Sequence, residues 1–183
     1  MIKNSQSKQH QIVVAASNLV SEDGVGQFTL EAVAAAAGVS KGGLLYHFPN
    51  KEALIEGMID IYLNDFEAEL EQIRTGLPED QHGRWLCAYV IASFEDVIDS
   101  SLVSAALAAI ANQPELLQRL GKRYDLWLAH AIDDGVSPMT ATLVMLATDG
   151  MWYTQTFGLN TTERVGSTQI RDYLLRLIAE DRT

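Results

Sequence analysis

The chain has 183 residues, 48% of them hydrophobic and 20% charged, a composition that supports a packed core and excludes an intrinsically disordered chain. Its length suits one compact domain, or a small domain joined to a larger one. Its net charge of −11, taken alone, argues against a protein that binds nucleic acid.

The distribution of charge along the chain changes that argument. Residues 1–52 carry 4 basic and 4 acidic side chains, whereas the rest of the chain carries 9 basic and 20 acidic ones. A neutral N-terminal segment attached to an acidic body suits a protein that presents one end to a polyanion and keeps the other end away from it.

The sequence shows no targeting signal and no cofactor motif. Its N-terminus is polar, and no apolar run approaches the roughly 20 residues of a membrane span. The single cysteine, Cys87, permits no internal disulfide, and the four histidines have no metal-ligand spacing. We therefore expect a cytoplasmic protein with no membrane partner, no metal and no cofactor.

The first elements in chain order are predicted helices. Residues 8–22 place apolar side chains on one helical face. Thr29 is a good N-cap for a short second helix, which ends at Gly38, a typical C′ residue. Ser40 then caps an equally short third helix, which ends before Asn50 caps the next one. A helix, a short turn with glycine and another helix form the pattern of a helix-turn-helix, whose second helix enters the major groove of DNA.

Two adjacent glycines lie inside the third helix, where each costs roughly 0.8–1.0 kcal/mol relative to alanine. A recognition helix must approach DNA closely, and glycine permits that approach. Leu45 and Phe48 are expected to anchor this helix in a small core, while Lys41 reaches phosphate or guanine. The predicted DNA contacts are Thr29, Ser40, Lys41, Gly42, Gly43, Tyr46, His47 and Lys51.

The remainder of the chain is also predicted to be helical, with prolines in the first turns of two helices. The predicted ranges are 51–74, 83–99, 101–112, 114–134, 138–157 and 162–180. With the first three helices they make an all-α chain of nine helices.

The segment "FTLEAVAAAAGVSKGGLLYHFPNKEALIEGMI" resembles the DNA-binding domain of the tetracycline-repressor (TetR/AcrR) family of bacterial transcription regulators. The hydrophobic-threonine start, the AGVSKG turn and LLYHFPNKE before a long helix carry this resemblance. It implies a helix-turn-helix domain at 1–50, completed by the start of the helix at 51–74, and a helical ligand-binding and dimerisation domain at 51–183. It also implies that the residues predicted above face DNA, and that the last two helices pair with those of a second copy.

Apolar stripes on those last two helices agree with a homodimer, which also suits half-sites about 34–36 Å apart on DNA. Ordinary packing within one chain is the alternative. The predicted interface residues are Leu146, Gly150, Tyr153, Phe157, Ile170, Leu174, Leu177 and Ile178.

Aromatic and apolar residues of the acidic body are candidates for an effector pocket, although each also suits a plain core. Asp149 differs from the others, because a carboxylate within an apolar stretch needs a hydrogen bond, a counter-charge or a proton if it is buried. It could meet a ligand, or bond across helices or the dimer interface. The candidate pocket residues are Tyr89, Phe94, Trp127, Met145, Asp149 and Trp152.

These patterns predict a sequence-specific DNA-binding transcriptional regulator. They do not predict an enzyme, because no zinc-protease motif, phosphate loop or nucleophile elbow occurs. The expected mode is a repressor released from a palindromic operator by an apolar or aromatic small molecule. The alternative is a regulator that acts without a ligand or with a co-repressor.

Overall fold

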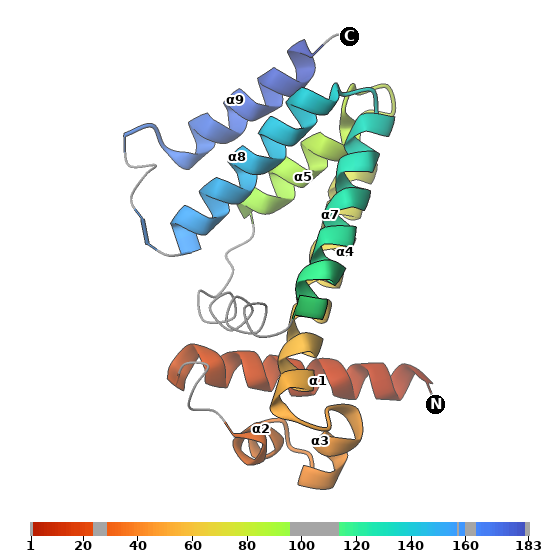
Figure 1. Cartoon of the computed structure of the whole chain (residues 1–183), viewed down its shortest axis with the longest axis vertical. Coiled ribbons are helices and arrows are strands. Elements are labelled where there is room, and N and C mark those ends of the chain that lie inside the picture. The colour runs from red at the N-terminus through yellow and green to blue at the C-terminus, as the bar shows by residue number, and fades with distance from the viewer. Residues whose placement is uncertain (1, 24–28, 96–113, 157, 160–163, 182–183) are drawn as a thin grey trace. The chain divides into compact units, whose positions relative to one another are not determined.

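The computed structural model describes residues 2–23, 29–95, 114–156, 158–159 and 164–181, and the elements within these ranges are helices (Figure 1). Eight helices are described, so the predicted all-α fold is confirmed, while the predicted helix at 101–112 lies outside the described residues. The helices are α1 (Ile2–Asp23), α2 (Leu30–Ala36), α3 (Lys41–His47), α4 (Lys51–Gly76), α5 (Arg84–Glu95), α7 (Pro114–Asp133), α8 (Pro138–Thr156) and α9 (Ser167–Glu180).

The short helices begin where the sequence predicts, because each has a side-chain cap three residues before the backbone N–H that it satisfies. The hydroxyl of Thr29 accepts from the Ala32 N–H at 3.1 Å, and that of Ser40 accepts from the Gly43 N–H at 3.0 Å. The helix α2 ends as predicted at Gly38, whose φ of +64° closes a Schellman turn.

The chain divides into two compact units, which are described separately. The first unit holds Met1–Asp65 and the start of α7; the second holds Phe66 to the end of α5 and the chain from Gln118 onward. The division falls within α4. The predicted domain boundary between residues 50 and 51 stays a prediction.

The core of the first unit is apolar throughout its described part. It is built from α1, α2, α3 and α4 with Leu116 of α7, and the apolar face predicted for residues 8–22 is the part contributed by α1. Leu44 of α3 is fully buried, whereas the predicted anchor Leu45 is only partly buried, and Phe48 is buried as expected. The residues with no measurable exposure include Ile12, Ala16, Val20, Val33, Leu44, Leu54 and Met58.

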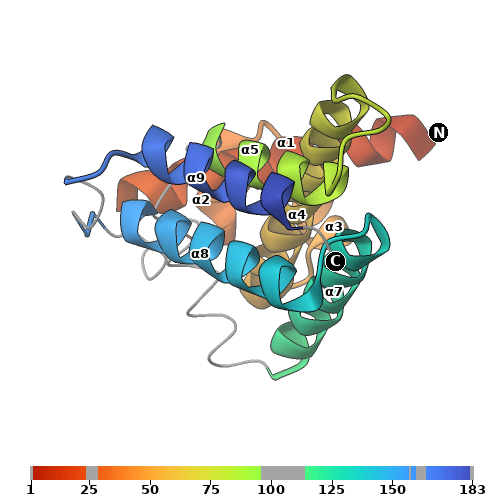
Figure 2. The ribbon, with the colours of Figure 1, turned by 90° about the horizontal axis from the view of Figure 1, so that it is seen from above.

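In the second unit, α5, α8 and α9 pack against one another, and Figures 1 and 2 show the three helices side by side. Helix α9 begins at Ser167, five residues after its predicted start, and residues 160–163 lie outside the described ranges. None of the described helices combines the length and apolar character needed to cross a membrane.

Candidate functional site

Helix α3 presents an exposed surface to solvent, as a recognition helix requires. Tyr46 is 83% exposed, Lys41 and Gly42 are exposed, and His47 is half-buried with its ring against that of Tyr46. Leu44 on the opposite side holds the helix in the core. Tyr46 therefore projects outward as predicted, whereas His47, predicted to do the same, is half-buried.

The two glycines of α3 have different surroundings. A Cβ added at Gly42 would meet no atom within 4 Å, so nothing within the described chain requires glycine there. A Cβ added at Gly43 would lie 3.2 Å from the Ser40 hydroxyl, the oxygen that caps the helix. The capping hydroxyl of Ser40 therefore explains why residue 43 is a glycine. Only at Gly42 is close approach to a partner the remaining explanation for a glycine.

Lys41 forms an ion pair across the helix-turn-helix. Its Nζ lies 2.5 Å from Oε1 of Glu31 in the first turn of α2, and both side chains are exposed. The Lys41 ammonium donates to the carboxylate and, together with a backbone hydrogen bond and its charge, lowers the pKa of Glu31. Glu31 was not among the predicted contacts; its signal in the sequence was its place two residues after Thr29, on the exposed side of α2.

The other predicted contacts flank this surface. Thr29 is exposed, and its hydroxyl is already engaged as the cap of α2. Asn50 caps α4 by accepting from the Ala53 N–H at 2.7 Å. Lys51 follows as the first residue of α4 and is half-buried.

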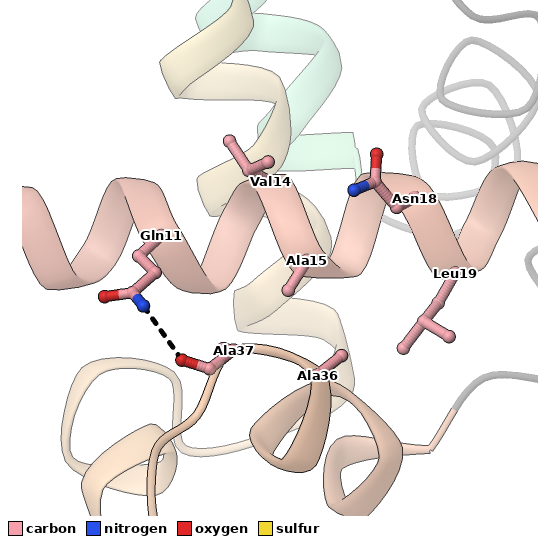
Figure 3. Close-up of a pocket in the computed structure, with 7 residues that line it drawn as sticks. All are labelled: Gln11, Val14, Ala15, Asn18, Leu19, Ala36 and Ala37. Atoms are coloured by element: carbon pink, nitrogen blue, oxygen red, sulfur yellow. Dashed lines mark hydrogen bonds between the residues drawn. The ribbon is translucent and has the colours of Figure 1, made fainter.

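A shallow depression of about 330 Å³ lies between α1 and α2 (Figure 3). Its floor consists of alanine methyl groups, and the carboxamide of Gln11 donates across it to the Ala37 carbonyl at 3.1 Å. That bond ties α1 to the end of α2, just before the turn. No charged residue lines the depression, which is lined by Gln11, Val14, Ala15, Asn18, Leu19, Ala36 and Ala37.

In the second unit, aromatic side chains from three helices meet. Tyr89 of α5 contacts both Phe66 of α4 and Trp127 of α7, with ring centroids 5.7 Å and 5.8 Å away. Trp85 stacks on Tyr89 at 5.6 Å. The structure therefore brings together two of the predicted pocket residues, Tyr89 and Trp127. Phe66 was not predicted, although it lies four residues after Tyr62 on one face of α4.

Asp149 of α8 joins this aromatic cluster through hydrogen bonds. The Tyr89 hydroxyl donates to its carboxylate at 2.5 Å, and Tyr124 of α7 donates as well. Burial raises the pKa of Asp149, and the two phenols only partly oppose that shift. Burial likewise raises the pKa of both tyrosines, which remain neutral donors. Tyr124 was missed in the sequence analysis, although it lies three residues before Trp127 on one helix face.

The remaining pocket candidates lie near the end of α5 and along α8. Phe94 is half-buried on α5, Met145 is buried on α8, and Trp152 is half-buried with its ring 5.1 Å from that of Tyr153. The indole N–H of Trp127 donates to Glu67 at 2.9 Å, so this tryptophan has its own polar partner.

The predicted interface residues separate into two groups. Leu146 is 63% exposed, and Gly150 and Tyr153 are also exposed, on a face of α8 that includes Met139 and Leu143. Leu174 and Ile178, by contrast, are buried within the chain itself, where the Ile178 side chain packs beside Gly83. Ile170 and Leu177 are half-buried, and Phe157 lies outside the described residues.

Comparison with known proteins places both parts of the chain in one family. Residues 12–58 match the model described as bacterial regulatory proteins, tetR family, and residues 83–179 match the model described as tetracyclin repressor-like, C-terminal domain. No curated protein matches the chain.

Solved structures show the same fold over nearly the whole chain. A transcriptional regulator from Rhodococcus sp. Rha1 has a TM-score of 0.68 at 20% identity, covering 94% of this chain and 95% of its own. A TetR transcription regulator from Haloarcula marismortui ATCC 43049 has a TM-score of 0.72 at 17% identity, covering 94% and 97%. Salmonella enterica GusR has a TM-score of 0.63 at 25% identity, covering 94% and 95%.

The chain therefore belongs to the TetR family of transcription regulators. It is a DNA-binding regulator, and the family is not one of enzymes.

Proposed function

We propose that the protein is a repressor that binds a palindromic operator as a homodimer and is released by an apolar or aromatic small molecule. It would act in the cytoplasm on double-stranded DNA. The observation that carries the DNA-binding part is the exposed surface of α3, where Tyr46 is 83% exposed and the space beside Gly42 is open. The predicted contacts are Thr29, Ser40, Lys41, Gly42, Gly43, Tyr46, His47 and Lys51.

The dimer is supported by the exposed apolar face of α8. Met139, Leu143, Leu146 and Tyr153 recur at helical spacing, although each is exposed in the single chain. A Cβ added at Gly150, on the same face, would meet no atom within 4 Å. A second copy packed on this face would bury these side chains and use the room beside the glycine.

The effector is proposed to bind beside the aromatic cluster of the second unit. Tyr89, Trp127 and Asp149 offer aromatic faces and a buried carboxylate within one connected group. Phe94, Met145 and Trp152 are proposed to extend this region. A ligand releases the protein from DNA only if it binds the DNA-free conformation more tightly than the DNA-bound one.

The first experiment is a titration of the purified protein against the DNA upstream of its own gene, repeated at several salt concentrations. We expect saturable binding by one dimer or more per site, lost when the palindrome is scrambled. Lys51→Ala should weaken binding about equally for all sequences and reduce the salt slope by about 1. Binding that ignores the palindrome would contradict the proposal.

Gly42→Leu tests the argument from close approach, with Gly121→Leu on α7 as the control, because neither site has an atom within 4 Å of an added Cβ. We expect Gly42→Leu to weaken operator binding at least tenfold and Gly121→Leu to leave it unchanged. Equal binding by both variants would remove Gly42 from the interface.

The alternative is a regulator that acts without a ligand or with a co-repressor. A screen of lipophilic aromatic compounds against the operator complex separates these modes. A compound that weakens operator binding supports the inducer model, and one that strengthens it supports a co-repressor. No effect from any compound would favour the ligand-independent mode.

A further inference from the structure

The ion pair between Lys41 and Glu31 has no evident role in folding. The two side chains are 58% and 61% exposed, and ion pairs between solvated side chains contribute little to stability. Thr29 already caps α2 and Ser40 already caps α3, so neither helix needs the pair for its start. The pair therefore calls for an explanation other than stability.

Glu31 is electrostatically unfavourable on a surface that faces phosphate. Between residues 29 and 52 the only charged residues are Lys41, Lys51, Glu31 and Glu52, so this segment carries no net charge. With so few cations, a carboxylate 2.5 Å from one of them removes a large share of the attraction to the DNA backbone. A regulator selected for affinity alone would have no use for it.

The pair does have the right pattern to recognise a base pair. In the major groove, G·C presents two adjacent acceptors, N7 and O6 of guanine, followed by the N4 donor of cytosine. A·T presents acceptor, donor and acceptor in turn. An ammonium that donates to both guanine acceptors, beside a carboxylate that accepts from cytosine N4, matches the three groups of G·C in order. On A·T, the same arrangement would place the ammonium against the N6 donor of adenine and the carboxylate against the O4 acceptor of thymine.

We propose that Lys41 and Glu31 act together to read one G·C base pair in each half-site, with Glu31 also weakening attachment to non-operator DNA. Lys41 donates to guanine, and Glu31 accepts from cytosine N4. Glu31 is thereby a specificity-determining residue whose effect on affinity for arbitrary DNA is negative. This inference rests on the DNA-facing surface of α3 proposed above.

The test measures base preference and non-specific affinity in the full-length protein. Wild type and Glu31→Ala are each used to select operators from a randomised library, and each is titrated against a non-operator duplex at several salt concentrations. We expect Glu31→Ala to reduce the preference for G·C at one position per half-site from roughly tenfold or more to about twofold. We also expect it to bind the non-operator duplex about three- to tenfold more tightly, with a steeper salt dependence.

Glu52→Ala is the matched control, because Glu52 is likewise an exposed acidic residue in the first turn of a helix of the same unit. It removes the same charge, so it too should tighten non-operator binding. It should leave the base preference at every position unchanged. A change of preference in both variants would mean that net charge, and not the pair, is responsible, and would overturn the inference.

Lys41→Gln alone and together with Glu31→Ala completes a double-mutant cycle. We expect Glu31→Ala to change base preference in the wild-type background and not in the Lys41→Gln background. If Lys41→Gln leaves operator binding unchanged, the proposed face of α3 is wrong. If Lys41→Gln weakens binding but Glu31→Ala alters neither preference nor non-operator affinity, only the reading pair is wrong.

Discussion

The two units of this protein differ in how far along the chain the groups that cap their helices lie. The second unit has a local cap as well, since the Ser137 hydroxyl accepts from the Thr140 N–H at 3.3 Å, but it adds acceptors from distant segments. In the first unit, Thr29, Ser40 and Asn50 each cap the helix that they precede, at a separation of three residues. In the second unit, the Trp85 N–H at the start of α5 donates to the carboxylate of Asp134, 49 residues away. The Ser137 N–H at the start of α8 donates to Asp181, 44 residues away.

The two units also differ in whether they bury polar groups. The described core of the first unit is apolar, and no described polar side chain of that unit is fully buried. The second unit buries the Asp149 carboxylate among phenols and keeps Ser93 and Thr148 inside. A small DNA-binding unit can be assembled from local signals, whereas the second unit depends on contacts between segments far apart in the chain.

Among the substitutions that test this difference between the two units, a change at Gly83 is expected to have the largest effect on stability. An added Cβ would lie 2.5 Å from Cγ2 of Ile178 and 2.7 Å from Cγ2 of Val136, and the φ of Gly83 is +61°. We expect Gly83→Ala to destabilise the second unit by roughly 2–5 kcal/mol, from the left-handed backbone and the overpacking together. All three tryptophans, Trp85, Trp127 and Trp152, lie in that unit, so denaturation followed by tryptophan fluorescence measures it.

Gly121→Ala is the control for that measurement. An added Cβ at Gly121 meets nothing within 4 Å, so this change should stabilise α7 by about 0.5–1 kcal/mol. If Gly83→Ala were as well tolerated as Gly121→Ala, the close contact among the three segments would not exist as described.

Gly57 is the counterpart in the first unit. An added Cβ would meet Cε1 of the Phe48 ring, which is buried only nine positions earlier in the chain. We expect Gly57→Ala to cost about 1–3 kcal/mol through overpacking, partly offset by the better helix propensity of alanine. Loss of helical circular dichroism at a lower temperature, with the tryptophan signal unchanged, would place the damage in the first unit. An altered tryptophan transition would contradict the separation of the two units.

Removal of a distant cap should have a smaller effect. Asp181 accepts from the Ser137 N–H at 2.6 Å, the Ser137 hydroxyl at 2.8 Å and the Thr140 hydroxyl at 2.7 Å. We expect Asp181→Ala to destabilise the second unit by about 1 kcal/mol, as loss of a helix cap usually does. The matched local cap is Ser40→Ala, which should leave the tryptophan transition unchanged. Equal tryptophan transitions for wild type and Asp181→Ala would show that α8 does not depend on this cap.

The smallest effect concerns pH, where two carboxylates of the second unit act in opposite directions. The hydrogen bond from the Ser137 backbone lowers the pKa of Asp181, so its contribution to stability is present above its ordinary value of 3.8 and is lost as the pH falls. Burial raises the pKa of Asp149, so the folded state binds a proton more readily than the unfolded state. Stability from this group is greatest at low pH and decreases as the pH rises from 3.8 to the raised pKa.

Asp149→Asn should remove the second of these dependences. A single proton changes the free energy of unfolding by no more than about 1.4 kcal/mol per pH unit. We expect the difference in unfolding free energy between wild type and Asp149→Asn to vary with pH in that window and to be constant above it. A difference independent of pH throughout would mean that Asp149 titrates normally.

Much of the first unit could be predicted from the sequence. The caps Thr29, Ser40 and Asn50 and the turn at Gly38 lie beside the helices that they define, so a local pattern contains all the information. Tyr46 was predicted to project from the third helix, and it is 83% exposed. The prediction that Leu45 anchors the third helix was less accurate, because the adjacent Leu44 is the leucine that is fully buried. Which of two adjacent leucines faces the core depends on where α1 and α4 lie.

The second unit was predictable in helix content and less so in its contacts. The sequence marked Asp149 as unusual, but it did not reveal that Tyr89 and Tyr124 hold its carboxylate. The sequence showed an apolar stripe on α9, but it did not reveal that Leu174 and Ile178 of this stripe are buried within the chain itself. An apolar stripe states that a surface must be covered, and does not state which surface covers it.

The sequence by itself therefore determined the helices, their caps in the first unit and the family to which the chain belongs, because each depends on residues a few positions apart. Only the tertiary structure decided that Glu31 forms an ion pair with Lys41 and that Asp149 accepts hydrogen bonds from two phenols. It also decided that Asp134 and Asp181 cap helices more than forty residues away along the chain. The physical reason is that hydrogen bonds and ion pairs depend on distance in space, which the folded backbone sets and local periodicity does not record.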